Sequence, residues 1–262
     1  MKKLYALLVG IALTFSACSD NKNSAKTITV GATPVPHAEI LEFVKPLLAK
    51  EGYTLNIQVF NDYVIPNIAV FQGEIDANFF QHTPYLEQFN KDKNTDLVKT
   101  VSVHLEPIGI YSTKLKSVYE LSDGAKISIP NDPTNLNRAL EVLQSASIIK
   151  LNNEKELKTK LDIVENARNV EIEELEAAQL PRTISDYELS VINTNFAIAA
   201  NLNPLKDALF LEGKESPYAN IVVVKKGNEN KEAIKALDKV LNSEDVRRFI
   251  REKYQGAILE AF

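Results

Sequence analysis

The sequence changes from a strand pattern to a helix pattern at Pro130-Asn131-Asp132-Pro133-Thr134-Asn135-Leu136-Asn137-Arg138. Residues 126–129 alternate as in a strand, and apolar side chains recur at helical spacing over 139–146. Asp132 can cap a helix that begins here, and such a helix directs its free N–H groups and the positive end of its dipole beyond the strand. Arg138 adds a planar fork that matches a carboxylate. The segment therefore indicates either a site for a small carboxylate or a capped helix with a surface arginine.

Strand and helix patterns alternate on both sides of this junction. Strand patterns lie at 27–31, 55–59, 75–79, 108–111, 126–129, 161–164, 189–192 and 221–224. Helical patterns lie at 40–48, 66–73, 138–149, 170–179, 231–241 and 244–254. In the helix predicted at 170–179, Glu173, Glu174 and Glu176 form one solvated face. The repeated β-α-β order predicts mainly parallel sheets with helices on both faces, in two similar halves.

The two halves are the predicted domains of an α/β protein. The last strand and helices need a sheet to cover, so we expect them to return to the first half. Residues 27–106 together with 197–262 are then lobe I, residues 107–196 are lobe II, and the chain crosses between the lobes near 105–108 and 194–198. Paired crossings allow hinge closure over a ligand, and ligands of such sheets bind outside the carboxyl ends of the strands. We therefore expect a ligand cleft between the lobes.

The N-terminus has the features of a signal peptide that ends before a cysteine. Two lysines precede an apolar run over 4–15, which is too short for a permanent membrane span. Small residues lead into Cys18, the single cysteine of the chain, which resembles the lipobox cysteine of bacterial lipoproteins. We expect a signal peptide at 1–17, lipid attachment at Cys18 and a flexible tether at 18–26. The protein would then be anchored in the cell envelope, facing the periplasm in a Gram-negative cell. The alternative is an ordinary secreted protein with a chance cysteine.

Composition and motifs argue against several other functions. A net charge of −5 over 262 residues, with scattered lysines, argues against a nucleic-acid partner. The sequence has no Gly-x-Ser-x-Gly elbow, and the mature chain has no free cysteine to act as a nucleophile, so we expect no catalysis and no cofactor.

The three histidines, His37, His82 and His104, are widely spaced in the sequence. Only His82 falls among the predicted cleft residues, and Arg138 in the same cleft would repel a cation, so we expect no metal. A metal-binding receptor with converging histidines is the alternative.

Seven segments of the mature chain carry further motifs in a fixed order. They are Val30-Gly31-Ala32-Thr33-Pro34 with His37-Ala38-Glu39-Ile40-Leu41, Asp62-Tyr63-Val64 with Pro66-Asn67, Asp76-Ala77-Asn78 with Phe80-Gln81-His82 and Pro84-Tyr85-Leu86, Ile129-Pro130-Asn131-Asp132-Pro133-Thr134-Asn135 with Arg138-Ala139-Leu140, Glu174-Leu175-Glu176-Ala177 with Gln179-Leu180-Pro181-Arg182, Ile192-Asn193, and Ser216-Pro217-Tyr218-Ala219-Asn220. With these motifs the mature chain resembles, along its whole length, the methionine-binding lipoproteins of bacterial ABC importers, the NlpA/MetQ-type family.

This resemblance implies a two-lobed, periplasmic-binding-protein-like (type II) fold. It also implies a monomeric receptor that delivers L-methionine to an ABC permease and its ATPase. The residues that it assigns to the ligand are, for the carboxylate, Arg138, Asn135 and Asn193; for the thioether, Tyr63 and Phe80 with His82 and Tyr85 beside them; and, for the last wall of the cleft, Tyr218 and Asn220.

The chemistry of methionine supports these roles independently. A zwitterion taken out of water needs its carboxylate paired and its ammonium given acceptors. Arg138 suits the first task, and Glu106, Asn193 or Asn220 suits the second. A thioether prefers polarisable aromatic surroundings, where each sulfur–aromatic contact contributes about 0.3–1.5 kcal/mol.

The same residues also have structural interpretations. Tyr63 and Phe80 could be core aromatics. His82 could be a structural histidine, and Asn193 could end a strand in a turn. Phe79 is assigned to the core, because strand alternation directs its side chain away from that of Phe80.

Two features leave the exact ligand open. Asn137 stands where the family often has glycine, and its side chain is expected to enter near the carboxylate site and to affect specificity. Members of the family also include receptors for a methionine-containing dipeptide. The alternatives are therefore a dipeptide receptor and a surface lipoprotein with a binding role outside transport.

Overall fold

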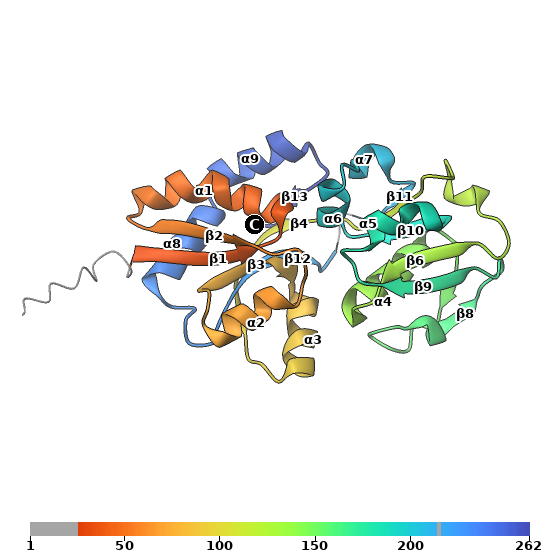
Figure 1. The fold of residues 1–262 in the computed structure, drawn as a ribbon, viewed down its shortest axis with the longest axis horizontal. Helices are drawn as coiled ribbons and strands as arrows, with labels where there is room; N and C mark the ends of the chain where they lie inside the picture. The colour runs from red at the N-terminus through yellow and green to blue at the C-terminus, as the bar shows by residue number, and fades with distance from the viewer. Residues whose placement is uncertain (1–25, 214–215) are drawn as a thin grey trace, which may run out of the picture.

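Two separate β-sheets organise the protein in the computed structural model, which describes residues 26–213 and 216–262 (Figure 1). The predicted signal peptide, Cys18 and the tether up to residue 25 lie outside the described residues. Among the helices that are described, none is both long and apolar enough to cross a membrane.

The first sheet has six strands in the order β13-β4-β12-β3-β1-β2. They are β1 (Thr27–Ala32), β2 (Thr54–Val59), β3 (Ala77–His82), β4 (Val98–Leu105), β12 (Ala219–Val224) and β13 (Leu259–Glu260). β1 pairs in parallel with β2 and β3, whereas β12 runs antiparallel to β3 and β4, and β13 runs antiparallel to β4. The sheet is therefore mixed, and the mainly parallel arrangement predicted from the sequence applies to its first three strands.

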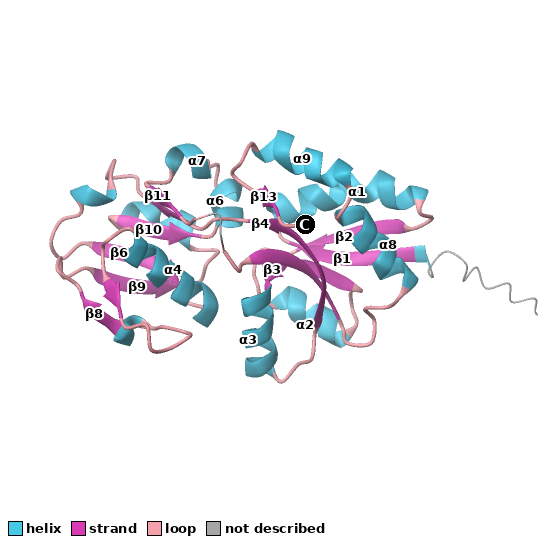
Figure 2. Ribbon diagram, turned by 180° about the vertical axis from the view of Figure 1, so that it is seen from behind, coloured by secondary structure: helices cyan, strands magenta, loops and turns pink. Residues whose placement is uncertain are grey.

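Helices cover both faces of this sheet (Figures 1 and 2). They are α1 (Glu39–Lys50), which follows a π-helical turn over Pro34–Ala38, α2 (Ile65–Gln72), α3 (Thr83–Lys93), α8 (Glu232–Leu241) and α9 (Glu244–Tyr254). Alternate side chains of β12 enter two hydrophobic clusters: Val222 and Val224 join residues of α1, α8 and α9, whereas Ile221 and Val223 join residues of α2 and α3. Burial on both faces explains the continuous apolar run of this strand.

The second sheet has five strands in the order β11-β5-β10-β6-β9. They are β5 (Gly109–Tyr111), β6 (Lys126–Pro130), β9 (Glu171–Leu175), β10 (Leu189–Ile192) and β11 (Phe210–Leu211), and a separate hairpin joins β7 (Lys150–Leu151) to β8 (Ile163–Glu165). The helices of this part are α4 (Pro133–Ser145), α5 (Leu180–Thr183), α6 (Thr194–Ala199) and α7 (Pro204–Asp207), with 3-10 turns at Val118–Glu120, Lys160–Asp162 and Ile184–Asp186. Leu140 and Leu143 of α4 pack with Ile127 and Ile129 of β6 in the core of this sheet.

The chain passes between the two sheets twice. The first crossing, at 106–108, joins β4 to β5, at the position expected from the sequence. The second lies at 212–218 and not near 194–198, because Phe210 and Leu211 still pair with β5. The lobe boundaries stay a prediction, and we propose from this pairing that lobe II ends after β11.

One predicted helix is wrong. Within the segment 170–179, residues Glu171–Leu175 form β9, which pairs in parallel with β6. The pairing outweighs the helix propensity of the glutamates. Glu173 and Glu174 therefore do not share a helix face: Glu173 accepts a hydrogen bond from the Tyr187 hydroxyl, and Glu174 pairs with Lys160. The predicted strand at 161–164 is likewise a 3-10 turn that continues into β8.

Candidate functional site

A small cavity lies between the two sheets, beside the first crossing. It is lined by Tyr63, Phe80, Gln81, His82, Tyr85, Glu106, Asn135, Arg138, Asn193, Thr194, Asn195 and Asn220. Eight of the nine residues assigned to the ligand from the sequence are in this set, and the ninth, Tyr218, contacts Arg138. The structure thus brings the predicted residues together from both sheets, and their contact with a ligand stays a prediction.

The strand-to-helix junction is built as the sequence predicts. β6 ends at Pro130, and the Asp132 carboxylate caps α4 by accepting the N–H of Asn135 at 2.9 Å. Pro133 occupies the first turn of the helix. The second turn then presents Arg138, which is 3% exposed, to the wall of the cavity.

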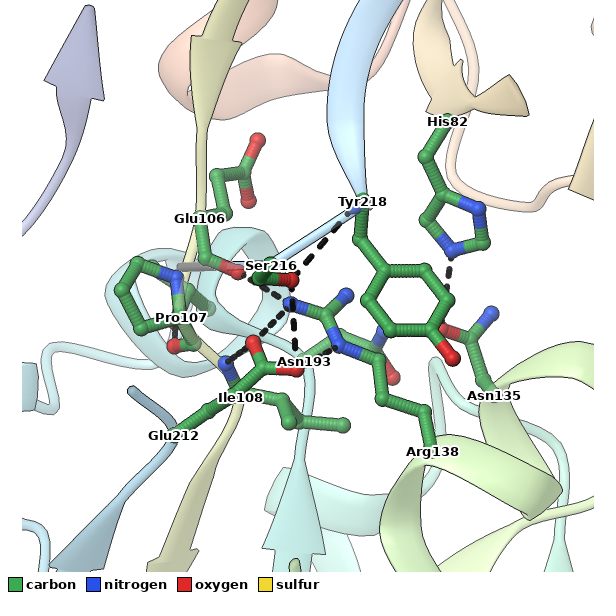
Figure 3. Close-up of polar contacts among 11 residues, drawn as sticks. His82, Glu106, Pro107, Ile108, Asn135, Arg138, Asn193, Glu212, Ser216 and Tyr218 are labelled. Atoms are coloured by element: carbon green, nitrogen blue, oxygen red, sulfur yellow. Dashed lines mark hydrogen bonds and ion pairs between the residues drawn. The ribbon is translucent and has the colours of Figure 1, made fainter. Parts of the chain in front are cut away.

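Arg138 is held by a carboxylate that the sequence did not reveal. Its Nε donates to Glu212 Oε1 at 2.9 Å, and its Nη2 donates both to Glu212 Oε2 and, at 2.7 Å, to the carbonyl of Glu106. Figure 3 shows the Tyr218 ring across the guanidinium, with its centroid 4.3 Å from Cζ. Nη1 has no hydrogen-bond partner among the described residues. One edge of the predicted fork is therefore occupied, and Nη1 is the donor left for a ligand.

A chain of hydrogen bonds links His82, Asn135 and Asn193 across the cavity wall. His82 Nδ1 accepts the N–H of Tyr85, so its Nε2 carries the proton and donates to Asn135 Oδ1 at 3.2 Å. Burial lowers the pKa of His82 to about 3, so the ring is neutral. Asn193 Nδ2 donates to the same Oδ1 at 2.9 Å, while Asn135 Nδ2 donates to Asp132.

This arrangement uses both polar atoms of the Asn135 side chain but only the Nδ2 of Asn193. Asn193 Oδ1 is buried and has no partner within the part of the chain that the structure describes. A buried acceptor without a partner costs about 1–3 kcal/mol. Asn193 therefore offers the cavity an acceptor that a bound donor would satisfy.

Aromatic rings form one end of the cavity. The Tyr63 ring lies 5.7 Å from that of Phe80 and 5.8 Å from that of Tyr85, centroid to centroid. The Tyr63 hydroxyl donates to Asn195 Oδ1 at 2.6 Å, which connects the first part of the chain to α6. Phe79 is fully buried in the core behind β3, as strand alternation predicts, whereas Phe80 faces the cavity.

Glu106 is the buried anion of the cavity, 6% exposed, in the first crossing. Its Oε1 lies 2.7 Å from His104 Nε2 and 3.2 Å from His37 Nε2. His37 Nε2 also lies 3.0 Å from Asn220 Oδ1, and its Nδ1 lies 2.7 Å from the Thr33 hydroxyl. Burial lowers the pKa of His37 to about 4 and that of His104 to about 3. Both imidazoles are therefore neutral beside the carboxylate.

Of the three histidines, His82 lines the cavity, whereas His37 and His104 converge on Glu106 without lining it. With Glu106 they offer three possible metal-ligand atoms within 4.8 Å of one another. Their nitrogen–oxygen separations of 2.7 and 3.2 Å lie within the range of hydrogen bonds, so these three atoms contact one another without an ion. The expectation of no metal stays a prediction.

The comparison with known families settles the membership of the chain. The profile described as NlpA lipoprotein matches residues 28–262. The chain belongs to the NlpA lipoprotein family. A relative of this family, the methionine-binding lipoprotein MetQ of Bacillus subtilis, is 44% identical over 271 residues, which cover 99% of this chain and 98% of that protein. The D-methionine-binding lipoprotein MetQ of Salmonella typhi is 41% identical over 260 residues, 97% of this chain and 95% of that protein.

A solved structure supports the same membership. A nutrient-binding protein from Burkholderia cenocepacia, bound to methionine, matches with a TM-score of 0.87 and 43% identity, over 90% of this chain and 100% of that chain. The NlpA-family fold of this protein is thus the expected two-lobed, periplasmic-binding-protein-like (type II) α/β fold.

Asn137, the departure from the family pattern, does not enter the cavity. It lies within α4 with helical backbone, and its Oδ1 accepts the N–H of Lys158 at 2.9 Å. The Asn137 side chain therefore does not contact the predicted carboxylate site directly, because it is directed to the loop before β8.

We expect Asn137→Ala to lower the free energy of unfolding by about 0.5–1.5 kcal/mol, through the lost hydrogen bond with Lys158, which alanine's helix propensity partly offsets. The ratio of affinities for methionine and a methionine dipeptide should stay within about twofold, since the side chain does not line the cavity. Urea denaturation and calorimetry measure both quantities. Gln72→Ala, at an exposed helical amide, is the matched control. A changed ligand preference in Asn137→Ala alone would contradict this interpretation.

Glu212 and Gln81 were missed by sequence reasoning for different reasons, and the cavity-lining Thr194 and Asn195 were not assigned to the ligand either. Glu212 follows a two-residue strand and belongs to no motif, and its partner Arg138 lies 74 residues away. Gln81 lies inside a quoted motif, and it completes a buried amide network with Asn67 and Asn78 beneath the cavity. The motif could have identified Gln81, whereas no sequence signal marks Glu212.

Proposed function

We propose that this protein is a lipid-anchored, monomeric receptor that binds L-methionine and delivers it to the permease and ATPase of an ABC transporter, without catalysis. Its attachment through Cys18 would place it on a membrane of the cell envelope. The observation that carries the proposal is a small buried cavity whose wall holds one cation, Arg138, and one anion, Glu106, next to an aromatic end. A zwitterion with an apolar side chain is complementary to that combination.

The polar wall offers donors for the carboxylate of an amino acid and acceptors for its ammonium group. Arg138 Nη1 suits the carboxylate, and so does Asn220 Nδ2, because His37 already occupies the Oδ1 of that amide. Glu106 and the unpaired Oδ1 of Asn193 suit the ammonium group. Asn135 supports this wall indirectly, since its amide orients Asn193.

The aromatic end suits a thioether. Tyr63, Phe80 and Tyr85 provide polarisable ring surfaces, and each sulfur–aromatic contact contributes about 0.3–1.5 kcal/mol. The printed names of relatives agree, because they describe methionine-binding and D-methionine-binding lipoproteins and a protein bound to methionine.

A methionine-containing dipeptide is the second candidate ligand. A neighbouring hollow shares Tyr63 and Tyr85 with the cavity and is also lined by Asp62, Asp132 and Glu176. Movement of the two tyrosines would join the hollows and admit a longer ligand.

A thermal-shift screen of the purified full-length protein tests the function. We expect L-methionine at 100 times its Kd to add about 2.7 kcal/mol to the free energy of unfolding, because it binds only the folded state. D-methionine, methionine dipeptides and the other amino acids complete the screen. The receptor proposal fails if no such ligand raises the melting temperature and denaturation releases no amino acid. A role as a non-transport surface lipoprotein would then be favoured.

A further inference from the structure

We propose that His37 and His104 are positioning residues that hold the Glu106 carboxylate in place as the acceptor for a ligand's α-ammonium group. They would thereby make the receptor select primary ammonium ligands over otherwise identical ligands without that group. This inference rests on the proposed function and adds two residues, neither of which lines the cavity.

The position of Glu106 explains why it needs such support. It lies in the crossing between β4 and β5, outside the strands of both sheets, so no sheet pairing fixes its backbone. Its Oε1 accepts a hydrogen bond from His104 Nε2 and lies 3.2 Å from His37 Nε2. A carboxylate has about four acceptor positions, so these contacts at one oxygen leave acceptor capacity on a side chain that lines the cavity.

The hydrogen-bond network of His37 determines where its proton lies. Asn220 Oδ1 can only accept, so His37 Nε2 must carry the proton that it shares between Asn220 and Glu106. Nδ1 is then an acceptor, and the Thr33 hydroxyl donates to it. His37 therefore contacts two acceptors that line the cavity, Glu106 and Asn220, through the same nitrogen, Nε2.

His104 has no polar contact other than Glu106 within the described part of the chain. The ring is fully buried, its Nε2 contacts Glu106, and its Nδ1 is without a partner. A buried imidazole with one unsatisfied nitrogen is costly, so a packing role alone would be served better by an apolar ring. The contact with Glu106 is what this histidine provides.

The two imidazoles support the carboxylate without cancelling its charge. Because both are neutral, they donate hydrogen bonds while the negative charge stays on Glu106. A lysine or arginine in their place would form an ion pair and remove the attraction for an ammonium group. Neutral donors therefore suit a site that must bind a cation-bearing ligand.

Binding of two ligands to the purified full-length protein tests the inference: L-methionine, and 4-(methylthio)butanoate, which lacks the amino group. The readout is the ratio of the two affinities, measured by calorimetry. We expect His104→Phe, which keeps a ring and loses the donor, to lower the methionine preference about tenfold, the usual worth of a hydrogen bond to a charged group. Affinity for the deaminated ligand should change little. His104→Gln can still donate and should recover most of the preference.

Two further variants separate positioning from packing. Thr33→Val removes the hydroxyl that donates to His37 Nδ1 and helps to hold the ring, so it should lower the ratio several-fold. This variant keeps the inference testable if His104→Phe does not fold. Phe79→Leu alters the ring that packs against both histidines, at 4.7 and 5.2 Å, and should leave the ratio unchanged.

Three outcomes would overturn the inference: an unchanged ratio in His104→Phe and Thr33→Val, parallel losses for both ligands, or stoichiometric zinc or manganese in the purified protein. Wild-type protein that binds both ligands equally would overturn it while leaving a methionine receptor in place. Wild-type protein that binds neither would overturn the proposed function itself.

Discussion

Arg138→Ala is expected to abolish methionine binding, with a loss of about 3–5 kcal/mol, or roughly 10²- to 10⁴-fold in Kd. Arg138 is the buried cation of the cavity wall, and its removal would leave the ligand carboxylate without a counter-charge in a site sheltered from water. Calorimetry with L-methionine measures the loss. The full effect requires that the carboxylate pairs with Arg138 Nη1, since the other donors are already occupied.

Two variants control this experiment. Arg248→Ala removes an exposed arginine that pairs with Asp245 and should leave binding unchanged. Arg138→Lys keeps the charge but cannot reach both Glu212 and the Glu106 carbonyl, so we expect an intermediate loss. Circular dichroism establishes that each variant folds, because Arg138→Ala also leaves Glu212 unpaired. Binding of Arg138→Ala within tenfold of wild type would refute the carboxylate role.

The parts of the fold that local sequence determines were predictable. The capped junction at 130–138 follows from side chains within a few residues of one another, and the alternation around Phe79 and Phe80 follows from strand geometry. β9 was not predictable in this way, because its glutamates favour a helix and only its pairing with β6 makes it a strand. The late second crossing likewise depends on β11, which has two residues and little signal of its own.

The same distinction between local sequence and long-range contacts applies to the residues of the site. His82 and Asn193 were assigned from the family resemblance, and both follow predicted strands, whose carboxyl ends the topology brings together. The contacts of Glu106 with His37 and His104 depend on the order of β1, β3, β12 and β4 in the first sheet, which hydrophobic patterning does not specify. Glu212 shows the limit most clearly, because a lone loop glutamate has no pattern, and only the folded chain places it against Arg138.

Glu106→Gln is expected to weaken methionine binding by about 2–5 kcal/mol, the range measured when one partner of a buried charge pair is lost. Glutamine keeps the size of the side chain and can still accept from His37 and His104, so the variant removes the charge and little else. The ligand ammonium would then lose its counter-charge in the cavity. Affinity for the deaminated analogue should change far less, and calorimetry with both ligands measures the difference.

The pH dependence of methionine binding tests the role of Glu106 independently. Burial raises the pKa of Glu106 above its ordinary value of 4.5, against the opposing effects of His37 and Arg138. Methionine binding uses the ionised carboxylate, so wild-type affinity should fall as acid protonates it, beginning at a pH above that value. Glu106→Gln should show no such step, while Glu51→Gln, which alters an exposed pair with Lys239, should retain it. A step of equal size in Glu106→Gln would assign the titration to another group and remove Glu106 from the ammonium site.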